Sequence, residues 1–360
     1  MATTLIELRL IAAPANIGLS SQPVNGNSAP AATDHEMKMA FGPLPDTQEA
    51  SRTAWQPAAT PMHARHSMIG DWQMMTHYNA FLAYDHQSGP RGGDQFNSVN
   101  WLMLMATRRT GDNELAFHGM FSAEPWTTTG RGYPLIFQSG EAYRGQPLID
   151  RQHPHDFLME LSGRYGRLIA NETVFSFYVA PSGEPALGPP AFPHRLSAMD
   201  NPAAPVSHHW LDSTHISFGV LTAGIARKTW QWEGSWFNGR EPDDDRWDIE
   251  RPRLESYAGR FTWNPTPAWS AQISHGYLKE PEELHPGENV RRTTISALNV
   301  AELSRGHRLA ATTGHTKPVE KFFRVLLRRS VVAHARAITS PASFEPQTPV
   351  QQKQPEPHKH

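Results

Sequence analysis

The sequence has no cysteine, and this absence excludes several chemistries. Without a thiol among its 360 residues, the chain forms no disulfide, no thiolate metal site and no cysteine nucleophile. The formal net charge is only −2, so there is no basic surplus to attract nucleic acid. Binding through imidazole, carboxylate or thioether groups is left open.

Long apolar runs are also missing. The longest apolar stretch is 101–106, far below the roughly 18 residues of a transmembrane helix, so a helical membrane protein is excluded. Near the N-terminus, Glu7 and Arg9 interrupt a short apolar patch, and an export signal needs about 7–15 unbroken apolar residues. We interpret this as a wrongly recorded start codon or a lost signal.

Aromatic residues, by contrast, are plentiful, with 11 Trp, 16 Phe and 8 Tyr. Between 71 and 85 the even positions are mostly apolar, including Trp72 and Leu82, and the odd positions are mostly polar. This period of two over fifteen residues predicts a strand that is long for a soluble protein. Eleven strands are predicted in this way: 71–85, 95–109, 114–122, 156–165, 172–180, 213–227, 229–237, 256–263, 269–278, 291–302 and 307–314.

Long and short connections alternate strictly between these strands. In an antiparallel meander every second connection lies at the same end, which is how outer-membrane barrels place short turns and long loops. We therefore predict an all-β protein, an antiparallel up-and-down transmembrane β-barrel of about 12 strands, in the outer membrane of a Gram-negative bacterium. Aromatic side chains near strand ends are typical of barrel positions at the membrane interfaces. The aromatic residues predicted to lie near strand ends here are Trp72, Tyr84, Trp230, Trp263, Trp269 and Tyr277. A soluble β-sandwich or double-sheet protein is the alternative.

Three regions are predicted along the chain: a flexible arm at 1–60, the barrel with long loops at one end at 61–315, and an atypical tail at 316–360. Bacterial single-chain barrels have an even number of strands, so eleven strands leave a twelfth missing. We interpret the basic, Pro/Gln-rich tail as disordered or as the result of a frameshift or truncation after about 314. The predicted polar lining of the barrel includes His77, Glu233, Arg260 and Gln272.

Two long loops carry histidine and aspartate just before a strand begins, and the predicted topology places both at the same end. Imidazole and carboxylate groups suit borderline divalent metals. The sequence therefore predicts a site for Cu or Zn, although none of the usual ligand spacings is present. The alternative is a polar network that folds the loops into the barrel mouth. The candidate residues are His153, His155, Asp156, His208, His209, Asp212 and His215.

Methionine and histidine are also scattered ahead of the first long strand and within it. Thioether and imidazole together suit copper, Cu(I) above all. Chance composition is the competing explanation. The residues are His35, Met37, Met39, Met62, His63, His66, Met68, Met74, Met75 and His77.

Signals for catalysis are weak. Ser207 and His208 are neighbours, but sequence neighbours rarely form a working dyad. His215 and Ser217 would share one face of a strand, which we predict to point inward because the opposite face is more apolar. There is no Gly-x-Ser-x-Gly elbow and no Gly-rich phosphate loop, so we assign no catalytic residue.

Several long motifs resemble a family of predicted bacterial outer-membrane proteins without an established activity, some of them encoded near heavy-metal resistance and efflux genes. The resemblance covers roughly 55–300 and implies a barrel with a link to metals. It implies no activity, so no catalytic residue is carried over, and the chain departs from the pattern after about 314. The motifs are 100–105, 131–135, 145–156, 197–202, 208–215 and 237–242.

The sequence thus predicts a porin-like outer-membrane protein, either a small channel or an accessory of metal resistance. Its expected partners are outer-membrane lipid and metal ions or small solutes, and not nucleic acid. A soluble β-rich metal-binding protein with a His/Asp loop site is the first alternative. An outer-membrane barrel hydrolase is the second.

Overall fold

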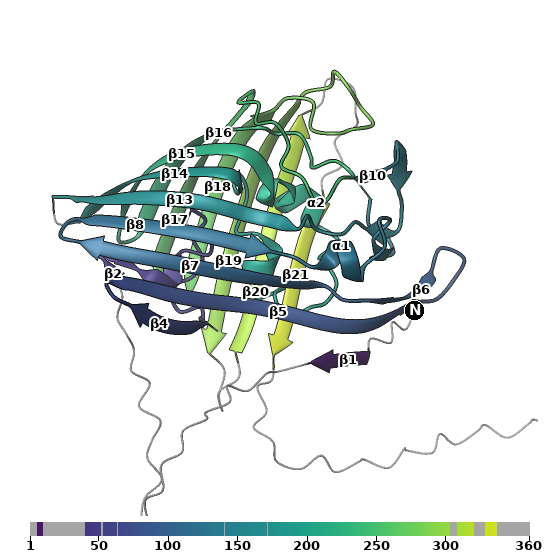
Figure 1. The fold of residues 1–360 in the computed structure, drawn as a ribbon, viewed down its shortest axis with the longest axis horizontal. Helices are drawn as coiled ribbons and strands as arrows, with labels where there is room; N and C mark the ends of the chain where they lie inside the picture. Colours follow the sequence, from purple (N-terminus) through teal and green to yellow (C-terminus); the bar gives the residue numbers. More distant parts are fainter. Residues whose placement is uncertain are drawn as a thin grey trace, which may run out of the picture.

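The computed structural model describes residues 6–9, 40–51, 53–62, 64–139, 141–170, 172–302, 308–319 and 328–336. Twelve antiparallel strands form one sheet, each pairing with the next along the chain, and each of the eleven predicted strands is confirmed. The sheet twists strongly, so that its last strands run steeply across the direction of the first in Figure 1. The twelve strands are β5 (Trp72–Gln87), β7 (Asn100–Thr110), β8 (Asn113–Phe121), β13 (Leu158–Ile169), β14 (Thr173–Gly183), β15 (Ser217–Arg227), β16 (Trp230–Phe237), β17 (Ser256–Thr266), β18 (Trp269–Leu278), β19 (Val290–Glu302), β20 (Arg308–Val319) and β21 (Arg328–Arg336).

The twelfth strand and the closure of the sheet both differ from the sequence prediction. We left the last strand in doubt, yet β21 pairs with β20 inside the stretch assigned to the tail. A closed barrel was expected, but the sheet stays open, because β5 and β21 do not pair in the described part of the chain. The free edge of β5 instead holds two short strands, β1 (Ile6–Arg9) and β4 (Arg65–Ile69). Their backbone groups occupy the hydrogen-bonding positions that closure would need.

The alternation of short and long connections is confirmed. Connections of two to five residues join β7 to β8, β13 to β14, β15 to β16, β17 to β18 and β19 to β20, and the connections between these pairs are longer. No helix in the described residues is long and apolar enough to cross a membrane. The remaining elements are β2 (Ala40–Phe41), β3 (Leu44–Pro45), η1 (Asp46–Gln48), β6 (Gly93–Asn97), α1 (Glu124–Thr127), β9 (Tyr133–Pro134), β10 (Glu141–Tyr143), β11 (Gln146–Leu148), β12 (Arg151–Gln152), η2 (Phe192–His194), α2 (His208–Leu211) and η3 (Ser213–His215).

The two faces of the sheet differ in the side chains that they carry. Many inward positions are polar and buried, beside apolar core clusters: Arg260 is 1% exposed and donates from Nε to Glu233 Oε2 at 2.9 Å. Gln272 is buried too, and His77 is half-buried with its ring edge-on to Trp101. Outward positions carry large apolar side chains, 38–60% exposed: Leu102, Leu104, Leu115, Phe117, Tyr165, Phe175, Phe177, Val179, Ile225, Trp232, Trp236, Tyr257, Trp263, Trp269, Ile273 and Ile295.

Residues 40–60 fill the interior at the short-turn end, although the sequence predicts a flexible arm over 1–60. Phe41, Leu44 and Trp55 pack against Val174 and Ala226 on the inner wall. These apolar side chains anchor the segment, because burying each one removes hydrophobic surface from water. Three hydrogen bonds complete the attachment of the segment to the sheet. Asn264 Nδ2 donates to the Gln56 carbonyl, and Ser270 Oγ donates to the Trp55 carbonyl. The Ala59 amide donates to the Pro267 carbonyl.

The long loop between β14 and β15 enters the interior from the other end. Leu187 is 2% exposed and belongs to a core cluster with wall residues such as Phe237 and Leu278. The carbonyl of Gly188 accepts from Arg260 Nη1 at 3.0 Å, and its amide donates to Ser274 Oγ at 2.9 Å. Loop and N-terminal segment therefore cover the polar inner face from opposite ends.

The predicted orientation at the start of β15 is wrong. Ile216 and Phe218 are the buried, inward residues, and they pack with Trp101 and Met103. His215 lies in η3, before the strand begins. The apolar face points inward here because it meets a methionine-rich core cluster at the loop end, where the sequence pattern alone suggested the outer surface.

Candidate metal centre

Two long loops bring all seven candidate residues to the same end of the sheet, as the topology predicted. His153 and His155 follow β12 and lie on either side of Pro154, whose ring restricts the backbone between them. His208 and His209 open α2, and His215 ends η3. Since successive residues of a helix point about 100° apart, His208 and His209 face different neighbours.

Three of these histidines form the centre of the cluster. The ligand nitrogens offered by His153, His208 and His209 all lie within 4.8 Å of one another, and all three residues are buried. A carboxylate joins them: Glu141 Oε1 is 3.0 Å from His153 Nε2 and 3.5 Å from His209 Nδ1. We call these four residues the loop cluster.

Burial sets the charge of the loop cluster. Desolvation lowers the pKa of His209 to about 4 and that of His208 well below its ordinary value, with the neighbouring imidazoles adding to the shift at His208. Both rings are therefore neutral at pH 7. The pKa of Glu141 is lowered although burial opposes this, because His153 and His209 face its carboxylate. The result at His208, His209 and Glu141 is two neutral imidazoles and one anionic carboxylate, which is the donor form that metal binding requires.

His155 and His215 form a second pair beside the loop cluster, with ring centroids 5.5 Å apart. Each is fixed through Nδ1, His155 by Glu124 Oε1 at 2.9 Å and His215 by the carbonyl of Asp212 at 2.9 Å. Their Nε2 atoms are buried and have no hydrogen-bond partner within the described chain. Phe192 packs against both rings.

The two candidate aspartates have structural partners. Asp156 accepts from Arg246 Nη1 at 3.1 Å, and Asp212 accepts from Arg195 Nη1 and the Phe192 amide. Burial raises the pKa of both carboxyls, opposed by the arginines. These residues support the loops, and Asp212 Oδ1 also lies 3.2 Å from His208 Nδ1. Holding the second ring nitrogen of a metal-binding histidine is a usual role for such a carboxylate.

Sequence reasoning missed Glu141 and Glu124. Glu141 stands between two predicted features, in the middle of the 122–157 loop, and no spacing relates it to the histidines. Glu124 lies in α1, immediately after a strand. The one available signal was compositional, because Glu141 and Asp150 are the two carboxylates between 128 and 152, and Asp150 pairs with Arg91.

The residues fit a borderline divalent ion with small movements. Two nitrogens on one tetrahedral zinc lie about 3.3 Å apart, given Zn–N bonds of about 2.0–2.1 Å. The separations of up to 4.8 Å therefore have to shorten by about 1–1.5 Å, a distance that rotamer adjustments of imidazoles supply. Three imidazoles with one carboxylate match the donor preference of Zn²⁺ or Cu²⁺.

Ser217, which the sequence places on the same strand face as His215, is engaged in another contact. Ser217 Oγ donates to the carbonyl of Thr214 at 3.1 Å, and His215 Nδ1 contacts the Asp212 carbonyl.

Comparison of the chain with family models, with curated proteins and with solved structures found no match. The family suggested by the sequence motifs therefore stays a prediction.

Proposed function

We propose that this protein is an outer-membrane protein of the β-barrel type, with its sheet open between β5 and β21 in the described residues, and that it binds a divalent transition-metal ion, Zn²⁺ or Cu²⁺, in its folded loops. The loop cluster carries the metal proposal. Three buried imidazoles lie together, two of them, His153 and His209, beside one oxygen of Glu141, and burial keeps His208 and His209 neutral at physiological pH. An accessory role in metal resistance, such as capturing ions at the cell surface, agrees with this chemistry.

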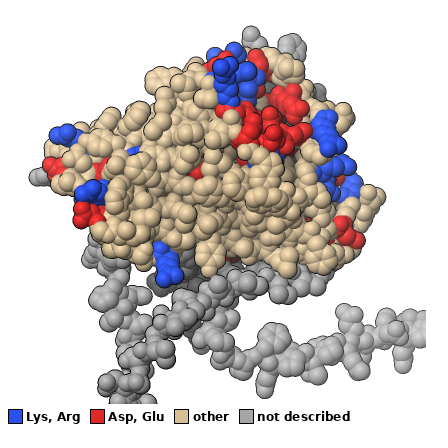
Figure 2. Space-filling model, in the orientation of Figure 1, with Lys and Arg blue, Asp and Glu red and all other residues tan. Residues whose placement is uncertain are grey.

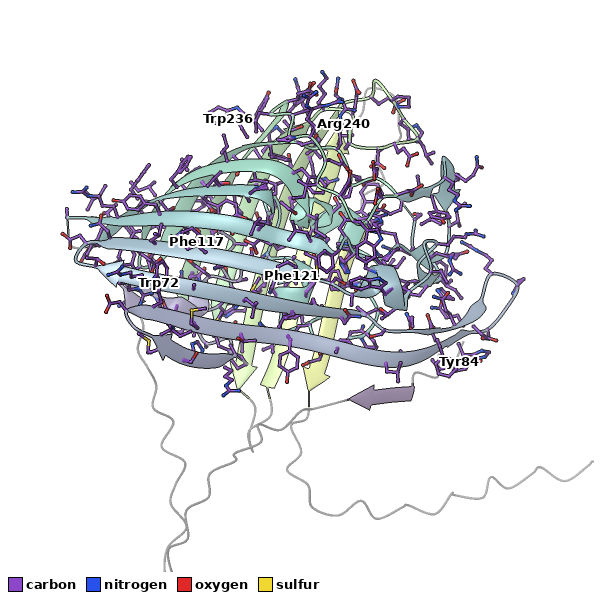
Figure 3. All side chains as sticks on the ribbon, in the orientation of Figure 1. Trp72, Tyr84, Phe117, Phe121, Trp236 and Arg240 are labelled. Carbon is purple, nitrogen blue, oxygen red and sulfur yellow. The ribbon has the colours of Figure 1, made fainter. Side chains whose placement is uncertain are left out.

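The outer surface of the sheet supports the membrane part of the proposal. Figure 2 shows a broad face without charged side chains, with Lys, Arg, Asp and Glu gathered toward the ends. Trp72, Tyr84 and Trp236 project from the outer surface in Figure 3. Trp72 and Tyr84 stand twelve residues apart on β5, which is about 40 Å along a strand and about 30 Å in height at the usual tilt.

Rings concentrate near both ends of the outer face. At the short-turn end Trp230 is directly opposite Trp263, and at the loop end Trp236 is directly opposite Tyr257. Tyr257 in turn stacks on Tyr277 with centroids 5.4 Å apart. Two belts of rings with aliphatic residues between them are what lipid-embedded barrels present to the bilayer. Exposed apolar surface of this extent is rare on soluble monomers.

The interior favours a plugged barrel over the open channel that the sequence also suggested. The inner-wall residues Arg260 and Thr294 are 1% and 0% exposed. Residues 40–60 cover the wall from one end, and the loop around Leu187 covers it from the other. An open pore would leave such polar side chains in water.

Zinc binding by the purified protein in detergent, freed of metal beforehand, tests the proposed function. We expect one Zn²⁺ per chain. His153→Ala and His209→Ala are each expected to weaken binding by at least about tenfold, since even residues that only support metal ligands cost about 10–100-fold. Glu141→Gln keeps the shape and removes the charge, and we expect a similar loss.

The matched control is His285→Ala, which removes an exposed histidine from another long loop and leaves the binding constant unchanged. Equal zinc affinity in the wild type, the two His variants and Glu141→Gln would contradict the proposal and favour a polar network that only folds the loops.

Cell fractionation separates the membrane protein from the soluble alternative. We expect the chain in the outer-membrane fraction, resistant to carbonate and released by detergent. Recovery of all the folded protein in the aqueous fraction without detergent would leave a soluble β-rich metal-binding protein as the better description.

A further inference from the structure

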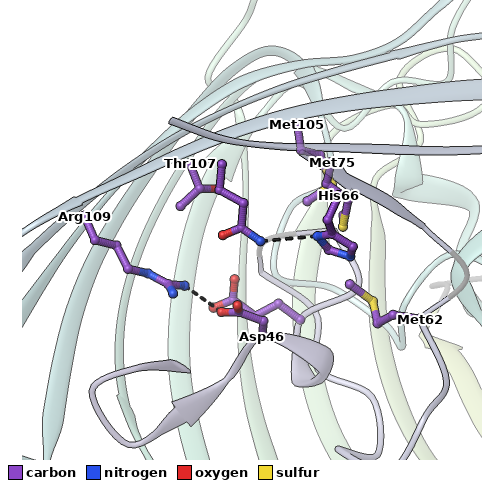
Figure 4. A pocket seen from close by; sticks show the side chains of 9 residues that line it. Asp46, Met62, His66, Met75, Met105, Thr107 and Arg109 are labelled. Atoms are coloured by element: carbon purple, nitrogen blue, oxygen red, sulfur yellow. Dashed lines mark hydrogen bonds and ion pairs between the residues drawn. The ribbon is translucent and has the colours of Figure 1, made fainter. Parts of the chain in front are cut away.

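A small, partly open pocket lies at the short-turn end, far along the strands from the loop cluster. Its wall comes from β4, β5, β7 and the N-terminal segment. Figure 4 shows the methionine and histidine side chains on one side of this cavity and Arg109 on the other. The lining residues are Asp46, Glu49, Met62, His66, Gln73, Met75, Met105, Thr107 and Arg109.

Sheet register places three soft donors in one row. His66 on β4 is directly opposite Met75 on β5, and Met75 is directly opposite Met105 on β7. Directly opposite residues of an antiparallel pair share a face, with Cβ atoms about 4.5–5.5 Å apart. Met62 approaches the same cavity from the N-terminal segment. The strand pairing produces this row, because β5 lies between β4 and β7 in the sheet and pairs with both.

The acidic residues in the cavity already have cationic partners. Asp46 Oδ1 accepts from Arg109 Nη2 at 2.6 Å, and Glu49 Oε1 lies 3.1 Å from Arg164 Nη2. A hard cation such as Ca²⁺ or Mg²⁺ prefers several carboxylate oxygens, and here it would compete with these arginines. The thioethers and the imidazole are the donors that carry no such ion pair.

The surroundings of the row suit a soft monovalent ion. Met75 and Met105 pack in a core cluster that also contains Met103, Met120 and Met159, so the sulfur side of the cavity is apolar and polarisable. The Gln73 amide contacts His66 Nδ1 at 3.3 Å, which leaves Nε2 facing no partner among the described residues. Thioether and imidazole donors select Cu(I) and its analogue Ag(I) over Zn²⁺.

We propose that Met62, His66, Met75 and Met105 form a second metal site, specific for a soft monovalent cation such as Cu(I), at the end of the sheet opposite the loop cluster. The site is independent of the proposed zinc or Cu²⁺ site. It differs from that site in donor type and in position, so either proposal stands if the other fails.

Silver provides the test, because Ag(I) has the same donor preference and does not change oxidation state. The background is His153→Ala/His209→Ala in detergent, so that the loop cluster does not contribute. We expect one Ag(I) per chain, with sulfur in the first coordination shell by X-ray absorption. Met75→Leu/Met105→Leu, which keeps side-chain volume, is expected to remove the sulfur signal and weaken binding by at least about tenfold.

The matched control is Met74→Leu, on the opposite face of the same strand. It keeps the affinity and the spectrum of the background protein. His66→Ala is expected to lower affinity and remove the nitrogen contribution while the sulfur signal remains. Absence of a sulfur-coordinated ion in the background protein, or unchanged binding in Met75→Leu/Met105→Leu, would overturn the proposal.

Discussion

At the scale of single residues, burial and neighbouring carboxylates compete in setting the pKa values of His194 and His155. His194 lies in η2 within the long β14–β15 connection, and its ring packs against Trp101. Desolvation lowers its pKa to about 4, although Glu160 opposes this. His155 shows the contrary case, because Glu124 raises its pKa despite complete burial. The pKa values of these two buried imidazoles are therefore shifted in opposite directions, and the upward shift at His155 is due mainly to Glu124.

Acidification should destabilise the loops through His194. In the unfolded loop the imidazole takes up a proton below about pH 6.5, whereas in the folded loop it does so near 4. The stabilisation is therefore present above pH 6.5 and is lost as the pH falls from 6.5 to about 4, by about 3 kcal/mol at most.

Hydrogen-exchange protection of residues 186–215 measures this effect in the metal-free protein. His194→Gln is uncharged at every pH and should flatten the decline between pH 6.5 and 4 relative to wild type. An identical pH profile in the two proteins would contradict the assignment to His194.

At the scale of elements, each strand separates two environments. On β14, Tyr178 and Ser182 are buried toward the interior, and Phe175, Phe177 and Val179 are exposed on the outer face. The period of two was readable in the sequence, but alternation does not say which face points inward. Burial in the folded sheet decides that, and the start of β15 shows that the apolar face is not always the outer one.

Arginine at an outer position distinguishes lipid from water. Phe177→Arg is expected to lower the free energy of unfolding by about 2–4 kcal/mol in lipid vesicles, the usual cost near the bilayer midplane. At a water-exposed site the change is usually within about 0.5 kcal/mol.

The measurement is reversible unfolding by guanidinium in vesicles, with Ile249→Arg as the control. Ile249 is exposed in the long loop between β16 and β17, so its replacement should leave the unfolding free energy nearly unchanged. Equal effects of the two variants would argue against a lipid-facing position for Phe177.

At the scale of the whole molecule, the filled interior limits transport. Trp55 is 2% exposed between wall residues at the short-turn end. Ser51 Oγ donates to Glu184 Oε2 at 2.6 Å, which joins the N-terminal segment to the loop that enters from the opposite end. The N-terminal segment and the β14–β15 loop thus meet inside the sheet, and each holds the other in place.

Planar-bilayer recording should consequently detect no steady ion conductance from the wild-type protein. The physical reason is that the polar side chains of the inner wall are buried and bond to one another, to the N-terminal segment and to the β14–β15 loop. Steady single-channel steps of the size seen for open porins would contradict the plugged arrangement and restore the channel interpretation. A porin reconstituted under the same conditions serves as the control.

Much of the architecture and part of the site could be predicted from the sequence. The strands follow from a local period of two, and the alternation of connection lengths assigns both histidine-rich loops to one end. The same alternation predicts that His153, His208 and His209 lie at one end, and there the structure brings them together. Glu141 could not be predicted, because its contact with two histidines depends on how the intervening loop folds back, and no short-range pattern encodes that path.

The sequence by itself determined the antiparallel order of the strands, their alternating polarity and the end at which the histidines gather, because each of these follows from neighbours along the chain. Only the tertiary structure decided that β1 and β4 occupy the edge of β5, that residues 40–60 enter the interior, and that Met75 stands between His66 and Met105. These features depend on register and packing between segments far apart in sequence, where a shift of one residue would turn every side chain to the opposite face.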